Sequence, residues 1–126
     1  DSKNTSLAIL FEVLYLLNLL LLPGIAFLIL AWFYFKYKDH SSSLVRSHLQ
    51  QTFFTSLIGG VFIVLVIALL FVFGGFSSSY IWMWIILYFT LAHSTLVVFG
   101  ALGLAKAMSS QSWRYPVIGP HLPKDN

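Results

Sequence analysis

The chain has 126 residues, of which 59% are hydrophobic and 9% are charged, and its formal net charge is +3 at pH 7. Soluble domains usually carry about 25% charged residues, so this composition excludes a water-exposed globular domain and predicts a single membrane domain. The seven basic residues are too few and too scattered for a nucleic-acid interface, and the absence of cysteine excludes disulfides, thiolate metal sites and a cysteine nucleophile.

The first apolar run covers residues 7–35 and is predicted to form the first of three membrane spans. As one helix it would be about 43 Å long, whereas the hydrocarbon core requires about 30 Å. Pro23 and Gly24 lie in the middle of the run. We expect them to kink or break the helix, because proline removes a backbone donor and clashes with the preceding turn. The run is longer than the apolar core of about 7–15 residues in a secretory signal, so it is interpreted as a retained span.

A polar segment separates the first span from the second. Within residues 43–52, apolar side chains recur at short helical spacings, and polar residues such as Arg46 and Gln50 take the other face. This pattern predicts a short amphipathic helix that lies in the headgroup region. An N-terminal extension of the second span explains the same pattern equally well.

The second and third spans are predicted at residues 53–73 and 80–108, joined by a short turn at residues 74–79. The second span has no charged residue, and the third begins with tyrosine and tryptophan side chains, which are typical of the membrane interface. The predicted fold class is therefore an all-α membrane protein. It has three transmembrane helices, the first kinked at its Pro-Gly pair, and a short amphipathic interfacial helix.

Positively charged residues flank two of the predicted loops. They are Lys36, Lys38 and Arg46 after the first span, and Lys106 and Arg114 around the end of the third. An odd number of spans puts both clusters on one side, and cytoplasmic loops carry an excess of Lys and Arg. The sequence therefore predicts a bacterial inner-membrane protein with its N terminus outside and a tail of residues 109–126 in the cytoplasm.

Two ionisable residues lie inside the predicted spans, where such groups are costly and are candidates for function. Glu12 lies near the outer end of the first span, where it is interpreted as a carboxylate that reaches the outer headgroups, or else as one of three buried polar residues of the spans, together with Asn18 and His93. His93 lies near the midplane, about 20 Å from Tyr80 along the helix. It is interpreted either as a histidine hydrogen-bonded to another helix, with Asn18 as its partner, or as the ligand of a haem or chlorophyll-type metal.

No catalytic constellation is visible in the sequence. It has no carboxylate pair suited to acid–base work, no HExxH metal motif and no glycine-rich phosphate loop. His40, His48 and His121 lie in polar segments and are expected at the surface. We therefore predict that the protein is not an enzyme and holds no cofactor or metal ion, with His93 as the remaining candidate ligand.

Five short stretches of the chain match the motifs of a known family. They are LPGI at residues 22–25, YKDHS at residues 37–41, VRSHLQQ at residues 45–51, AKA at residues 105–107 and RYP at residues 114–116. In these stretches the chain resembles a widespread bacterial family of small membrane proteins of unknown function, a distant relative of the chloroplast inner-envelope import component. The resemblance places the motif residues of that family at His48, Gln51, Lys106, Arg114, Tyr115 and Pro116.

These motif residues suggest a structural contact at the cytoplasmic interface. We expect His48 and Gln51 to lie near Lys106 and Arg114, and to join the amphipathic helix to the tail through hydrogen bonds. The alternative is that these side chains only solvate the interface.

Taken together, the residues predict a non-catalytic accessory or interaction subunit of a bacterial inner-membrane complex. Its partners would be the lipid bilayer and other membrane proteins or further copies of itself, without nucleic acid. The distant relation to an import component suggests an oligomeric pore or a protein-translocation component as the alternative. A haem- or pigment-binding protein that uses His93 is the second alternative.

Overall fold

A computed structural model of the protein describes residues 2–21, 23–74 and 79–122. The regular elements of this part are four helices: α1 (Ser2–Leu20), α2 (Ile25–Tyr37), α3 (Ser43–Gly74) and α4 (Ser79–Met108). Three of them, α1, α3 and α4, are long and apolar enough to cross a membrane, and α2 is shorter. The predicted fold class, an all-α membrane protein with three long apolar helices, is confirmed.

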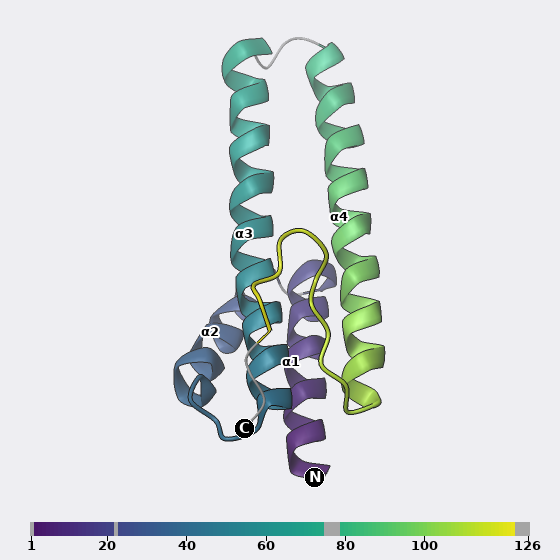
Figure 1. Ribbon diagram of the computed structural model, residues 1–126. Helices are drawn as coiled ribbons and strands as arrows, with labels where there is room; N and C mark the ends of the chain where they lie inside the picture. Colours follow the sequence, from purple (N-terminus) through teal and green to yellow (C-terminus); the bar gives the residue numbers. More distant parts are fainter. Residues whose placement is uncertain (1, 22, 75–78, 123–126) are drawn as a thin grey trace.

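Helices α3 and α4 form a long antiparallel pair, and α1 lies against one half of it (Figure 1). Helix α1 packs on α3, on α4 and on α2, while α2 also packs on α3. The halves of α3 and α4 that extend beyond α1 expose apolar side chains such as Val64, Val72, Phe73 and Ile86. These halves have the surface expected of helices surrounded by hydrocarbon.

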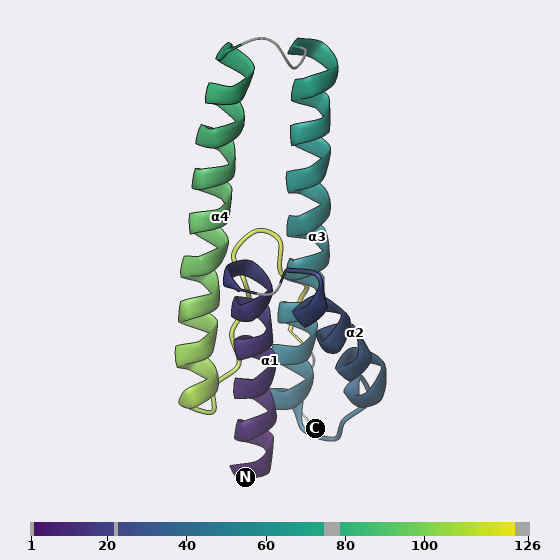
Figure 2. The same ribbon diagram turned by 180° about the vertical axis from the view of Figure 1, so that it is seen from behind.

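The first apolar run is not one kinked span. Helix α1 ends at Leu20, and α2 begins at Ile25 and runs back along α1 (Figure 2). Gly24 has a φ of +86°, a conformation that glycine adopts at no steric cost. The amide of Gly24 also donates to the Asn18 side-chain oxygen at 2.9 Å. The Pro-Gly pair therefore reverses the chain direction, which corrects the prediction of a kink within one helix.

The predicted amphipathic helix is not a separate element either. Helix α3 is continuous from Ser43 to Gly74, about 48 Å long, because its sequence contains no proline between the polar and apolar parts. The structure therefore agrees with an N-terminal extension of the second span. Of the turn expected at residues 74–79, residues 75–78 lie outside the described part.

The reversal also changes where the ends of the helices lie. The first turns of α1 and α3 and the last turns of α2 and α4 lie at one end of the molecule, which we call the base (Figure 1). A hydrogen bond of 2.5 Å joins the Thr5 and Ser110 hydroxyl oxygens there. The sequence predicted the N terminus and the C-terminal tail on opposite sides. With one additional reversal, the start of α1 and the chain after α4 lie together.

The chain after α4 is not a free tail in the part that the structure describes. Residues 109–122, which we call the C-terminal segment, fold back along α3 and α4 and turn near their middle (Figure 1). Tyr115 of this segment is fully buried and packs with Tyr15 and Leu96 in one of the two apolar clusters. The other cluster joins α1, α2 and α3, and its buried members are Phe11, Leu14, Leu30, Val45 and Leu49.

Candidate functional site

A group of polar side chains is fully buried where α1, α3 and the C-terminal segment meet. Its members, which we call the buried polar cluster, are Glu12, His48, Gln51 and Tyr115. Burying polar groups is costly unless each finds a hydrogen-bond partner, so the partners of these four side chains define what the site can do.

The Glu12 carboxylate lies at the centre of the cluster. One of its oxygens is 2.5 Å from Nδ1 of His48, and the other accepts a hydrogen bond from the Tyr115 hydroxyl. The second ring nitrogen of His48, Nε2, lies 2.7 Å from the carbonyl oxygen of Gln111. Both carboxylate oxygens and both imidazole nitrogens are therefore bonded within the protein.

This geometry fixes the net charge of the central pair. A carbonyl oxygen only accepts, so Nε2 of His48 carries a hydrogen. The contact between Nδ1 and Glu12 holds one further proton, which belongs either to the imidazole or to the carboxyl group. In both cases the Glu12–His48 pair is neutral as a whole, which avoids the large cost of an unpaired buried charge.

Gln51, one turn further along α3 than His48, holds the C-terminal segment at two points. Its amide nitrogen donates to the carbonyl oxygen of Pro120 at 2.6 Å. Its amide oxygen accepts from the backbone N–H of Tyr115 at 2.8 Å. One side chain thus satisfies backbone groups on both arms of the segment and fixes its turn.

Burial of the Tyr115 hydroxyl raises its pKa well above the ordinary value, and the negative charge of Glu12 raises this pKa further. The phenol therefore stays protonated at physiological pH and remains a hydrogen-bond donor to the carboxylate.

Two glycines of α4 allow α1 to approach closely enough for these contacts. A Cβ atom on Gly103 would overlap the Glu12 carboxylate, and a Cβ atom on Gly100 would overlap the ring of Tyr15. The Tyr15 hydroxyl donates to the carbonyl oxygen of Leu96 at 2.8 Å. Small residues that bring helix backbones together are typical of membrane helix packing.

The structure brings the motif residues together around one segment, but in two separate sets. His48, Gln51 and Tyr115 form the buried cluster, whereas the two basic residues bond at its edge. Lys106 donates to the Gln111 side chain at 3.3 Å, and Arg114 donates to the carbonyl oxygen of Gly119 at 2.9 Å. Pro116 lies in the turn of the segment, where its carbonyl oxygen accepts from the N–H of Ile118 at 2.8 Å.

Two expectations for single residues are wrong. Glu12 does not reach toward headgroups but is a buried polar residue, which was the alternative interpretation, and His48 is not a surface residue, because each side chain is 0% exposed. The reason is that α1 and α3 begin at the same end of the molecule, so the two residues face one another across the helix contact. By contrast, His40 lies in the loop before α3, where its Nδ1 accepts from the N–H of Ser42 at 3.0 Å.

His93 bonds to another helix, although not to the residue expected. Its Nε2 lies 2.9 Å from the carbonyl oxygen of Leu19 near the end of α1, and its ring stacks on Phe89. Asn18 instead bonds to Gly24. The nitrogen that would coordinate a haem or chlorophyll-type metal is therefore directed at a carbonyl oxygen. Within the described residues, no group of three or more His, Cys, Asp or Glu side chains could hold a metal ion.

Sequence reasoning missed the contribution of α1 to the site. Ala8, Phe11, Glu12 and Tyr15 are all buried, and their spacings of three and four positions place them on one helix face. That spacing was the available signal, and it placed Glu12 on the same face as a tyrosine and a phenylalanine.

Comparison with known proteins gives one family. The model of a family described as the magnetosome magnetite crystal formation protein family matches residues 3–122. No curated protein and no solved structure matches the chain.

Proposed function

We propose that this chain, which belongs to the magnetosome magnetite crystal formation protein family, is a non-catalytic membrane subunit that supports magnetite formation as a rigid scaffold. Membership of the family indicates the process, which is the formation of magnetite crystals. The structural part of the proposal rests on the bonding within the buried polar cluster.

One observation supports a scaffold over a reaction site. The Glu12 carboxylate bonds to the His48 ring and the Tyr115 hydroxyl. The second ring nitrogen of His48 and both amide atoms of Gln51 bond to backbone groups of the C-terminal segment. These side chains are also fully buried. This is the geometry of a clamp that fixes three parts of the chain relative to one another, so that a partner would meet a preformed surface.

The membrane and orientation form a second part of the proposal. The basic residues Lys36, Lys38, Arg46 and Lys106 belong to helix ends or loops at the base. The positive-inside rule then places the base in the cytoplasm, and with it both the start of α1 and the C-terminal segment. In place of the general bacterial inner membrane, we propose the magnetosome membrane as the location. Fractionation of magnetosomes from the remaining membranes tests this choice.

A deletion strain tests the function directly. Cells that lack the protein should form magnetite crystals of altered size or number in electron micrographs, and the wild-type gene should restore them. Glu12→Ala should fail to restore the crystals because it breaks the clamp, whereas Ser94→Ala, at an exposed position on α4, should restore them. Crystals of unchanged size and number in the deletion strain would remove the proposal. Immunoblots of membranes would show whether the Glu12→Ala protein is still present.

The partner also belongs to the proposal. Native purification in mild detergent should recover other membrane proteins of the same compartment, or further copies of this chain, and migration as a lone monomer would count against a subunit role. A part in protein translocation, suggested by the resemblance to an import component, is a separate prediction. Conductance of the purified protein in planar bilayers would support it.

A further inference from the structure

The hairpin of α1 and α2 reaches only part of the way along α3 and α4 (Figure 1, Figure 2). At the end of α1, the carbonyl oxygen of Leu19 lies 2.9 Å from Nε2 of His93 in α4. One turn further along α4, the side chain of Leu96 packs against Gly59 of α3, where a Cβ atom would lie 3.2 Å from it. The end of α1 is therefore about level with Gly59. From there α3 continues to Gly74 and rises by about 22 Å.

The uncharged stretch of α3 indicates where the hydrocarbon of the membrane lies. Residues 53–73 carry no charge and span about 31 Å, which matches the bilayer hydrocarbon of about 30 Å. Val72 and Phe73 near the far end of this stretch are 75% and 85% exposed. Gly59 lies about 9 Å inside the stretch, measured from its base side. The hairpin therefore ends before the midplane, although α1 is long enough to cross a membrane.

The tip of the hairpin has the hydrogen-bond partners that a chain reversal in hydrocarbon requires. The side-chain oxygen of Asn18 accepts from the N–H of Gly24, and the carbonyl oxygen of Leu19 has the His93 ring as its partner. Leu21, also at the tip, is apolar and 72% exposed. An unpartnered backbone group in lipid costs several kcal/mol, so these two polar side chains stabilise the reversal at this depth.

Helix α2 returns to the base and does not cross. The rings of Phe27 and Tyr34 both stack on Phe53, with ring centroids 5.6 and 4.4 Å apart. Helix α2 therefore lies at the level where α3 enters the hydrocarbon. Near its end, Nζ of Lys36 is 4.8 Å from the ring centroid of Trp32, and tryptophan is typical of the membrane interface. The two helices form a re-entrant hairpin, which enters and leaves the membrane on the base side.

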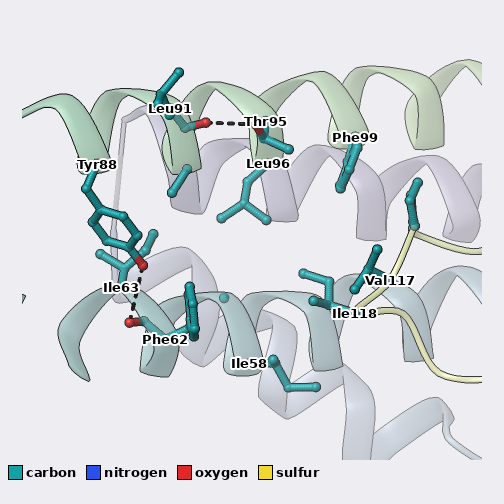
Figure 3. Close-up of a pocket in the computed structure, with 13 residues that line it drawn as sticks. Ile58, Phe62, Ile63, Tyr88, Leu91, Thr95, Leu96, Phe99, Val117 and Ile118 are labelled. Atoms are coloured by element: carbon teal, nitrogen blue, oxygen red, sulfur yellow. Dashed lines mark hydrogen bonds between the residues drawn. The ribbon is translucent and has the colours of Figure 1, made fainter. Parts of the chain in front are cut away.

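The C-terminal segment adds to the same half of the molecule. Its turn places Val117 and Ile118 beside Ile58 of α3 (Figure 3). Beyond this level, the described chain consists of α3 and α4, where the Tyr88 hydroxyl donates to the carbonyl oxygen of Phe62 at 3.4 Å (Figure 3). At a diameter of about 10 Å per helix, the four helices of the base half occupy about 310 Å² in cross-section, and the two helices of the far half about 160 Å².

We infer that the protein is a wedge that favours curved membranes in which the leaflet at the base is on the convex side. A protein that occupies more area in one leaflet fits a bilayer in which that leaflet is expanded, and the expanded leaflet is the convex one. Helices inserted from one side of a bilayer are known to be sensitive to its curvature. With the base in the cytoplasm, as proposed above, the protein favours membranes that bend into the cell.

Labelling of single cysteines tests the hairpin. The natural chain has no cysteine, so Leu21→Cys and Ser79→Cys each introduce one. Both variants are reconstituted into phosphatidylcholine vesicles with a membrane-impermeant maleimide on both sides. Leu21→Cys should react at least about tenfold more slowly than Ser79→Cys, because the reactive thiolate does not form in hydrocarbon. Both should react equally in denaturing detergent. Equal rates in vesicles would place the tip in water on the far side and overturn the inference.

Sorting between flat and curved membrane tests the wedge. Ser109→Cys is reconstituted into giant phosphatidylcholine vesicles and labelled only from outside with a fluorescent impermeant maleimide, so that only molecules with the base outward are seen. Tubes are then pulled outward, which makes their outer leaflet convex. The ratio of protein to a lipid dye should be higher in the tube than in the vesicle and should increase as the tube narrows. Ser79→Cys, labelled in the same way, shows molecules of opposite orientation, and its ratio should be lower in the tube.

Two outcomes of the sorting experiment overturn the inference. Equal ratios in tube and vesicle would show that the two halves of the molecule fit a flat membrane. Enrichment of both labelled variants in the tube would show a preference that does not depend on orientation. Circular dichroism establishes that each variant retains its helices. The vesicles contain no partner and no magnetite, so failure here leaves the proposed scaffold role to be decided by the deletion strain.

Discussion

Glu12 in α1 and His48 in α3 are hydrogen-bonded at 2.5 Å between side chains that are both fully buried. The carboxylate also accepts from the hydroxyl of Tyr115, so this one pair joins α1, α3 and the C-terminal segment. The position of the chain after α4 therefore depends on a residue near the beginning of α1.

Glu12→Ala should lower the free energy of unfolding by about 3–5 kcal/mol, because it leaves His48 and Tyr115 buried without their common partner. Unfolding of the purified protein in mixed micelles, followed by circular dichroism as denaturing detergent is added, measures this change. Ser6→Ala, at an exposed position on the same helix, is the matched control. A loss below about 1 kcal/mol would show that the cluster is hydrated and not a clamp.

Gln51→Ala should release the turn of the C-terminal segment without unfolding the helices. Gln51 satisfies the N–H of Tyr115 and the carbonyl oxygen of Pro120, and the alanine can do neither. We expect faster tryptic cleavage after Arg114 than in the wild type, measured by mass spectrometry over time. Gln50→Ala changes the neighbouring residue of α3 and should be cleaved at the wild-type rate. Equal rates for both variants would contradict the role of Gln51.

Alkaline pH should destabilise the protein through Tyr115. Burial and the charge of Glu12 raise the pKa of Tyr115 in the folded state. The unfolded state therefore loses this proton first, from about pH 10 upward. The stabilisation is fully present below that pH and is lost as pH rises toward the folded-state pKa.

Unfolding midpoints between pH 8 and pH 11 check this prediction. Tyr115→Phe should be less stable than the wild type at pH 8, by about 1–3 kcal/mol for the lost hydrogen bond to a buried carboxylate. Its stability should fall less steeply above pH 10 because one titrating group has been removed. Parallel curves for the two proteins would rule out Tyr115 as a source of the alkaline loss.

Gly103→Ala should cost about 1–3 kcal/mol, because the added methyl group overlaps the Glu12 carboxylate and separates α1 from α4. Gly60→Ala on α3 provides the contrast, since a Cβ atom there has nothing within 4 Å. The second substitution should leave stability unchanged or raise it by about 0.5–1 kcal/mol through helix propensity. A destabilisation of similar size in both variants would place the effect outside the α1–α4 contact.

Single cysteines should report the same side of the membrane for the start of α1 and the end of α4. The natural chain has no cysteine, so Ser6→Cys, Ser109→Cys and Ser79→Cys each introduce one label site. A membrane-impermeant maleimide added to oriented vesicles should modify the first two from one side and the third from the other. Modification of Ser6→Cys and Ser109→Cys from opposite sides would contradict this arrangement and support the topology that the sequence predicted.

Much of the site could be anticipated from the sequence, but its centre could not. His48 and Gln51 were expected to bond to the chain after the third span, and the structure places both against it. Glu12 was assigned to the headgroups, because its bonding partners His48 and Tyr115 lie 36 and 103 positions away in the sequence. No local pattern indicates contacts over such separations.

The sequence by itself determined that lipid surrounds this protein and that its backbone is helical. Long uncharged stretches exclude water as the solvent, and a backbone in hydrocarbon must satisfy its hydrogen bonds within each helix. It also determined where the first run breaks, because proline and glycine act locally. Tertiary structure decided that the chain reverses at Gly24, that Glu12 is buried and that the C-terminal segment returns along α3 and α4. In a membrane, surfaces that face lipid and surfaces that face other helices are similarly apolar. Composition therefore does not distinguish them, and only the packed arrangement assigns each residue its partner.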